Sequence, residues 1–106
     1  MNEGRYDWPG KSGEEYLYRV YRLPCGFRPV PGNYIFAAET PPWKWTPIYI
    51  GETEDLSEHL DDHQAMLCIR EYPATHIHVH ANDGDQVDRC SEEQDLIARW
   101  NPPCNR

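Results

Sequence analysis

Residues 75–80 read Thr-His-Ile-His-Val-His and place the strongest single constraint on how this 106-residue chain folds. Strict alternation of polar and apolar side chains has the two-residue period of a β-strand. It places Ile77 and Val79 on one face and His76, His78 and His80 on the other. We expect the apolar face to pack on a core and the histidines to form a polar outer face.

Three other segments, rich in Tyr, Ile or Val, also predict strands: residues 15–23, 34–38 and 47–51. The second and third are expected to form a long hairpin. Residues 1–13 show no periodicity and are expected to form a lead or loop. With two helices added, the expected element order is β-β-β-α-β-α.

Two helices are predicted from apolar stripes. Thr53 can cap the first helix, whose buried stripe would be Leu56, Leu60, His63 and Leu67. The second helix ends at residues 101–103, where two prolines follow Asn101. Its stripe comprises Cys90, Glu93, Leu96, Ile97 and Trp100.

The charge balance is strongly acidic, with 10 basic and 18 acidic residues and a net charge of -8. Thirteen of the acidic groups lie in residues 52–106, which argues against indiscriminate attraction to nucleic acid or to anionic membranes. No apolar run reaches the roughly 20 residues of a membrane span, and the polar start is unlike a signal peptide. A cytoplasmic protein is expected, with its four cysteines as thiols, although paired disulfides stay open.

Glu93 is the first candidate for chemistry, because a carboxylate on an apolar stripe must be paired, neutralised or holding a cation. Tyr34 and Tyr49 lie on the two strands of the predicted hairpin and could act together on one phosphate or carbonyl group. Packing alone is the simpler interpretation of both tyrosines. A zinc site that uses His76, His78 and a cysteine is a further alternative.

Taken in order, these pieces resemble the GIY-YIG endonuclease domain. Residues 31–36 look like its first motif, with Asn33 in place of the usual Ile, and residues 49–53 match its second. Leu56, Leu60 and His63 follow at the spacing of the family's helix, and residues 93–97 and 101–105 resemble its glutamate and asparagine motifs. The resemblance divides the chain into an N-terminal extension, residues 1–30, and a nuclease-like domain, residues 31–106.

The resemblance implies a small α+β fold, with a central three-stranded antiparallel sheet flanked by helices; the extension could add an edge strand. It implies that Glu93 holds one divalent cation, Mg²⁺ or Mn²⁺, at the scissile phosphate. Tyr34 would be the general base and Tyr49 would orient the water or the phosphate. Asn105 would brace the site, and His63 would complete the set of catalytic candidates.

His59 departs from the family pattern, which places an arginine there. Arginine is permanently charged and binds two oxygens at once, whereas histidine is shorter and titrates near neutrality. The expected function is therefore a metal-dependent DNA endonuclease in which His59 acts as an imidazolium or slows the reaction. The alternative is a binding or regulatory module whose chemistry has decayed. DNA is the expected substrate, and a homodimer or a protein partner is open.

Overall fold

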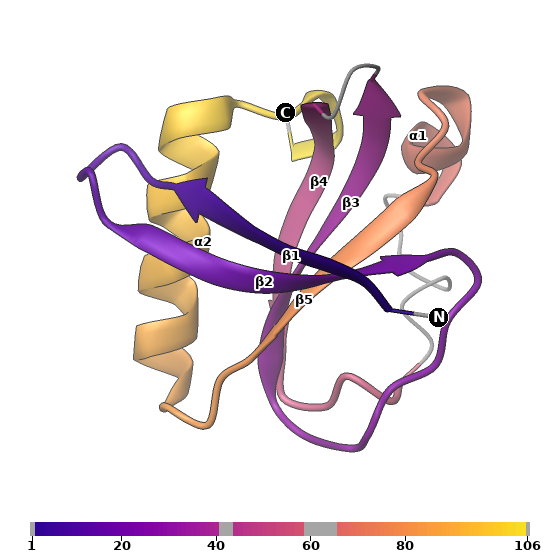
Figure 1. Ribbon diagram of the computed structural model, residues 1–106. Helices are drawn as coiled ribbons and strands as arrows, with labels where there is room; N and C mark the ends of the chain where they lie inside the picture. The colour runs from indigo at the N-terminus through magenta and orange to yellow at the C-terminus, as the bar shows by residue number, and fades with distance from the viewer. Residues whose placement is uncertain (1, 41–43, 59–65, 106) are drawn as a thin grey trace.

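The computed structural model describes residues 2–40, 44–58 and 66–105, which form an α+β fold around one antiparallel sheet (Figure 1). The elements are β1 (Asn2–Pro9), β2 (Glu15–Arg22), β3 (Gly32–Thr40), β4 (Lys44–Thr53), α1 (Met66–Glu71), β5 (His76–Ala81), α2 (Gln86–Trp100) and the 3₁₀ turn η2 (Pro103–Asn105). No helix among these residues is long and apolar enough to cross a membrane.

The sheet has five strands in the order β1-β2-β5-β3-β4, where three and a possible edge strand were expected. The N-terminal extension supplies two of them: β1 pairs with β2, and β2 pairs with β5. The predicted loop over residues 1–13 was wrong, because β1 pairs along most of its length. The sheet curls so that the β1–β2 hairpin crosses β3 and β4 (Figure 1).

The strands predicted at residues 15–23, 34–38 and 47–51 are confirmed, and β3 and β4 form the expected hairpin. A bulge after Phe36 interrupts their register. It leaves Ile48 without a partner on β3, and Ile48 packs in the same core as Phe36. The two faces of the sheet therefore do not alternate evenly along β4.

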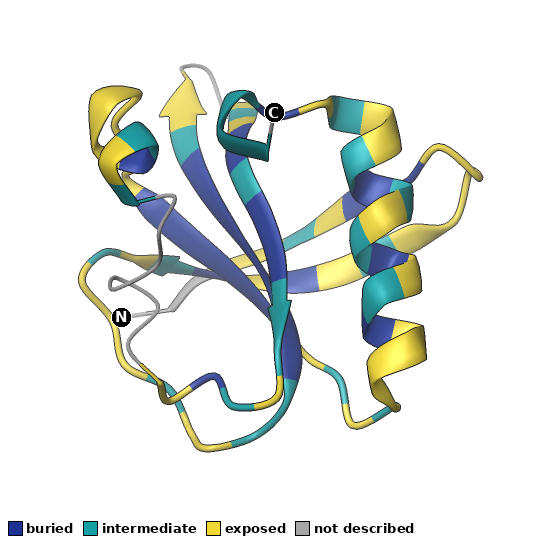
Figure 2. Ribbon diagram, turned by 180° about the vertical axis from the view of Figure 1, so that it is seen from behind, coloured by how far each residue is buried: buried dark blue, intermediate teal, exposed yellow. Residues whose placement is uncertain are grey.

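Both faces of the curled sheet are buried along its centre (Figure 2). One core contains Tyr34, Phe36, Ile48, Leu56, Ile69, Ile77 and Val79. The other contains Trp8, Tyr18, Ile35, Ala37, Ile50 and Leu96. Helix α2 supplies Leu96 to the second core, and α1 supplies Ile69 to the first.

The prediction that the histidines of β5 form a polar outer face is wrong for His76 and His78. His76 is 1% exposed and His78 is fully buried. Trp45 packs against both rings, and Trp8 contacts His78. Because β5 is the middle strand of five, both of its faces are covered.

The helix expected after Thr53 differs in the described residues. Thr53 ends β4, and its hydroxyl accepts a hydrogen bond from the Asp55 N–H, so it caps a turn there. Leu56 is buried as predicted, but Leu67 is 79% exposed and Ile69 is the buried residue of α1. His59, Leu60 and His63 lie outside the described residues.

Two cysteines form a disulfide, which corrects the expectation of four thiols. Cys68 of α1 is bonded to Cys104 of η2, 36 residues further along. Cys25 and Cys90 are free. The bond ties the C-terminal turn to α1, while the same turn packs against β4.

Candidate functional site

Four of the expected site residues gather at the outer edge of β4: Tyr34, Tyr49, Glu93 and Asn105. Together with Glu52 they are called the edge site. β4 is the last strand of the sheet, and α2 and η2 pack against it. Residues from the hairpin, the last helix and the C-terminal turn therefore meet there, although the chain separates them by up to 71 positions.

Tyr34 is 2% exposed, and its phenol lies over Gly51 on the neighbouring strand. A Cβ atom at residue 51 would stand 2.6 Å from the Tyr34 hydroxyl, so only glycine leaves room for the ring. The ring centroids of Tyr34 and Tyr49 are 6.2 Å apart. The two phenols therefore form a pair on one face of the hairpin.

The edge site is electronegative. Burial, and then Tyr49, Glu93 and Glu52, raise the pKa of Tyr34 well above its usual value. Burial and Glu93 raise the pKa of Tyr49 in the same direction. Both phenols are protonated at neutral pH, and Glu93 is close enough to act on both.

Glu93 is half-buried, and burial, with a smaller contribution from Glu52, raises its pKa. Within the described parts of the chain, its carboxylate makes no ion pair; Gln94 donates a long hydrogen bond of 3.4 Å to it. A partly desolvated carboxylate with acceptor capacity left is one that a cation would stabilise.

Glu93 is not at the centre of the buried stripe of α2, contrary to the sequence prediction. The buried residues of this helix are Arg89, Glu92 and Leu96. Glu92 is the more buried acid: it accepts a hydrogen bond from the Tyr18 hydroxyl at 2.6 Å and binds His80 Nδ1 at 2.9 Å. The stripe is rotated by about one residue, which turns Glu93 toward β4.

Glu52 is the site residue that sequence reasoning missed, because it was counted within the motif at residues 49–53 and given no role of its own. It lies in β4, and its carboxylate binds Arg89 Nε at 3.1 Å. The Cys90 thiol contacts the other carboxylate oxygen at 3.8 Å. The alternation of side chains along β4 could have predicted its position, because Glu52 lies two residues after Ile50 and therefore on the same face, which packs toward α2.

Asn105 braces the edge strand through its side-chain amide. Its Oδ1 accepts a hydrogen bond from the Ile50 N–H, and its Nδ2 donates one to the Ile50 carbonyl, both at 2.8 Å. These two bonds continue the ladder of the sheet where the next strand would be. Asn105 thereby fixes the strand segment between Tyr49 and Gly51.

A cluster of three or more His, Cys, Asp or Glu side chains suited to a metal ion does not occur in the described residues. The burial of His76 and His78 argues against the zinc alternative, because both rings pack against the Trp45 ring and are not open to a metal ion. Magnesium differs from zinc in needing only one or two protein carboxylates, with water and phosphate oxygens completing its shell. Glu93 fits that requirement.

Comparison of the chain with protein-family models, with curated proteins and with solved structures finds no match. Its function is therefore inferred from the geometry and electrostatics of the edge site.

Proposed function

We propose that this chain is a divalent-metal-dependent endonuclease of the GIY-YIG type that hydrolyses DNA phosphodiester bonds. The observation that carries the proposal is the meeting of Tyr34, Tyr49 and Glu93 at one edge of the sheet. They come from three elements, and the same three residues matched the family's motifs in sequence. From this position Glu93 raises the pKa of both phenols, and perturbed pKa values of this kind are typical of functional sites.

Glu93 would hold the cation, with Glu52 beside it. When bound there, Mg²⁺ or Mn²⁺ would polarise a phosphoryl oxygen and lower the pKa of nearby phenols. Glu52 is already paired with Arg89, which leaves Glu93 as the carboxylate with free acceptor capacity.

The phenols would act first as positioning groups. Tyr34 and Tyr49 keep their protons in the free protein, so each can donate a hydrogen bond to a water molecule or to a phosphate oxygen. The base role expected for Tyr34 requires a lower pKa than the free protein provides. Asn105 would keep the Tyr49 strand segment in place. His59 and His63 keep their expected roles as proposals, because they lie outside the described residues.

The same raised pKa values favour a second candidate, a binding or regulatory module without activity. Two carboxylates beside the buried Tyr34 and the half-buried Tyr49 disfavour a phenolate base. Arg89 is 4% exposed, and its guanidinium group is occupied by Glu52 and the Gly84 carbonyl. On this view the edge site would be a relic, and the surface would serve a protein partner or a second copy of the chain.

A cleavage assay separates the two candidates. Supercoiled plasmid, single-stranded DNA and branched DNA would be incubated with the protein in Mg²⁺, Mn²⁺ or EDTA. Glu93→Gln should abolish metal-dependent cleavage, whereas Glu71→Gln, an exposed change of equal charge on α1, should leave it unchanged. Equal residual nicking by wild type and Glu93→Gln would contradict the nuclease proposal and favour the module.

A cytoplasmic location is expected from the sequence and is part of the proposal. Disulfides are rare in the cytosol, so this location requires Cys68 and Cys104 to be reduced in the cell. Trapping cellular thiols by alkylation at harvest, followed by mass spectrometry of these two cysteines, tests the location. A fully oxidised pair would point to an oxidising compartment.

A further inference from the structure

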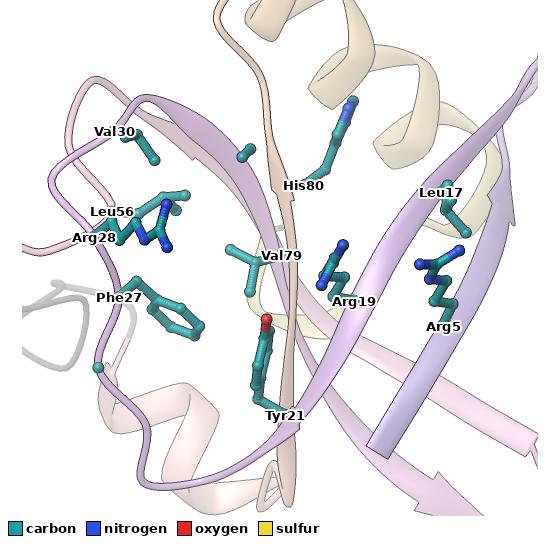
Figure 3. Close-up of a pocket in the computed structure, with 12 residues that line it drawn as sticks. Arg5, Leu17, Arg19, Tyr21, Phe27, Arg28, Val30, Leu56, Val79 and His80 are labelled. Carbon is teal, nitrogen blue, oxygen red and sulfur yellow. The ribbon is translucent and has the colours of Figure 1, made fainter. Parts of the chain in front are cut away.

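A cleft of about 1140 Å³ opens on the sheet face that carries Tyr34, on the side of β5 and β2. It lies between the β1–β2 hairpin and the segment that precedes β3 (Figure 3). Three arginines and two aromatic rings from these segments line it: Arg5, Arg19, Arg28, Tyr21 and Phe27. We call it the arginine cleft. His80 also borders it, but the His80 side chain points toward α2, away from the cleft (Figure 3).

Two of the arginines face each other across β1 and β2. Arg5 is the register partner of Arg19, so their side chains leave the same face about 5 Å apart at Cβ. Like charges in directly opposed positions destabilise a sheet. Within the part of the chain that the structure describes, neither guanidinium group makes an ion pair or a hydrogen bond with a carboxylate. An anion bound between the two guanidinium groups would relieve their mutual repulsion.

Arg28 approaches the cleft from the opposite wall, beside Val30 and Leu56 (Figure 3). It is exposed and likewise lacks an ion pair with any described carboxylate. Three such guanidinium groups around one concavity are unusual in a chain whose net charge is -8. Positive charge is therefore concentrated at this cleft.

The wall between the arginines is aromatic and aliphatic. Tyr21 and Phe27 are half-buried and meet edge to face, with ring centroids 5.2 Å apart. Val79 forms the floor beside Tyr21 (Figure 3). A simple inorganic anion would use only the guanidinium groups, whereas a ligand that also carries a flat apolar ring would cover these side chains too.

We propose that the arginine cleft binds an unpaired nucleotide, with its phosphate on the arginines and its base against Tyr21 and Phe27. Guanidinium groups bind phosphate oxygens in pairs, and bases stack on aromatic side chains without regard to sequence. A free nucleotide and a nucleotide within a single strand present the same chemistry. The proposal uses no residue of the edge site, so it stands or falls separately from the nuclease function.

The cleft is aligned with the edge site. Arg19, Val79 and Tyr34 are consecutive register partners across β2, β5 and β3. With about 4.8 Å between strands, the backbones at Arg19 and Tyr34 are about 10 Å apart across the sheet. A single strand bound in the cleft could therefore extend toward the phenols.

The test is direct binding in EDTA, where cleavage is suppressed. Fluorescence polarisation would follow a labelled oligothymidylate and a labelled mononucleotide between about 50 and 200 mM salt. For the oligothymidylate, one phosphate neutralised by each of the three arginines predicts a slope near -2 for the logarithm of the association constant against that of salt, at about -0.7 per phosphate for single strands. Arg19→Ala and Arg28→Ala should each weaken binding about tenfold or more. Arg70→Ala, an exposed arginine on α1 outside the cleft, is the charge-matched control.

Phe27→Leu tests the base contact and should weaken nucleotide binding while leaving pyrophosphate binding unchanged. Binding of both probes supports a free nucleotide, and binding of the oligonucleotide alone supports a strand. The proposal is overturned if Arg19→Ala and Arg70→Ala bind alike. It is equally overturned if pyrophosphate or an acidic peptide competes as well as the nucleotide does. Circular dichroism would confirm that each variant is folded.

Discussion

The indole Nε1 of Trp8 donates a hydrogen bond of 2.9 Å to Nδ1 of His78, 70 residues further along the chain. Both side chains are fully buried. The bond requires Nδ1 to be unprotonated, so His78 is a neutral imidazole with its proton on Nε2. It ties the first strand to the middle strand, although the two are not neighbours in the sheet.

Trp8→Phe should lower the free energy of unfolding by about 2–4 kcal/mol, because it leaves Nδ1 of His78 unsatisfied and opens a cavity. Urea denaturation would measure the loss. Trp100→Phe is the control, since its half-buried indole donates to the Pro9 carbonyl, where water can replace it. Equal losses in the two variants would show that the Trp8 bond has no special weight.

Acid should destabilise the protein through His78. Burial, and then the neighbouring His76, lower the pKa of His78 from 6.5 to about 3. Between these values the unfolded chain binds the extra proton and the folded chain does not. Stability is therefore complete above pH 6.5 and falls as the pH drops toward 3, by up to about 1.4 kcal/mol per pH unit.

His78→Asn keeps an acceptor near the position of Nδ1 and removes the titration. Its unfolding free energy, measured from pH 7 to pH 4, should decline less steeply than that of wild type. His80 has the opposite tendency, because its hydrogen bond to Glu92 raises its pKa. Its contribution is present in both proteins and cancels in the comparison. Parallel pH profiles would refute the assignment to His78.

Gly51→Ala should destabilise the protein by about 1–3 kcal/mol, because the new Cβ would displace the ring of Tyr34. If the nuclease proposal holds, cleavage should fall as well. Gly26→Ala is a matched control, since a Cβ there meets nothing within 4 Å. Thermal unfolding and near-ultraviolet circular dichroism would report both effects, and an undisturbed Gly51→Ala spectrum would argue against the contact.

Asn105→Asp should cost about 1–3 kcal/mol, because the carboxylate keeps the bond from the Ile50 N–H but faces the Ile50 carbonyl without a donor. Hydrogen exchange at the Ile50 amide would remain slow, while global stability falls. Asn105→Ala should lose both bonds and speed that exchange. Slow exchange in both variants would mean that the amide is protected by another group.

Reducing the Cys68–Cys104 disulfide should lower the unfolding free energy by about 3–4 kcal/mol, the chain-entropy value for a loop of this length. Calorimetry with and without dithiothreitol would show a lower melting temperature for the reduced protein. Cys68→Ser should melt like reduced wild type and be insensitive to the reagent. Cys25→Ser, at an exposed free cysteine, should retain the full response.

Local patterning determined much of the fold. The alternation of polar and apolar residues predicted β5, and turn and β-branched residues predicted β2, β3 and β4. Asn101 and the prolines after it predicted the end of α2, where the Asn101 N–H donates a hydrogen bond to the Ile97 carbonyl. These features depend on neighbours within a few positions, which sequence periodicity reports directly. The motif residues Tyr34, Tyr49 and Asn105 lie near the same strand, β4, and their roles there stay predictions.

Other features depended on contacts between distant segments. Residues 1–13 carry no period of their own, and β1 forms within them only by pairing with β2. Glu92 and Glu93 are adjacent, and a rotation of α2 by one position decides which of them is buried with Tyr18 and which faces β4.

The sequence alone thus determined four of the five strands, the end of the last helix and which side chains could carry chemistry. The tertiary structure decided that β5 is covered on both faces, that Glu52 joins the edge site, and that three arginines line one cleft. The reason is that burial, ion pairing and charge clustering are set by which surfaces meet when the sheet curls, and periodicity carries no information about those partners.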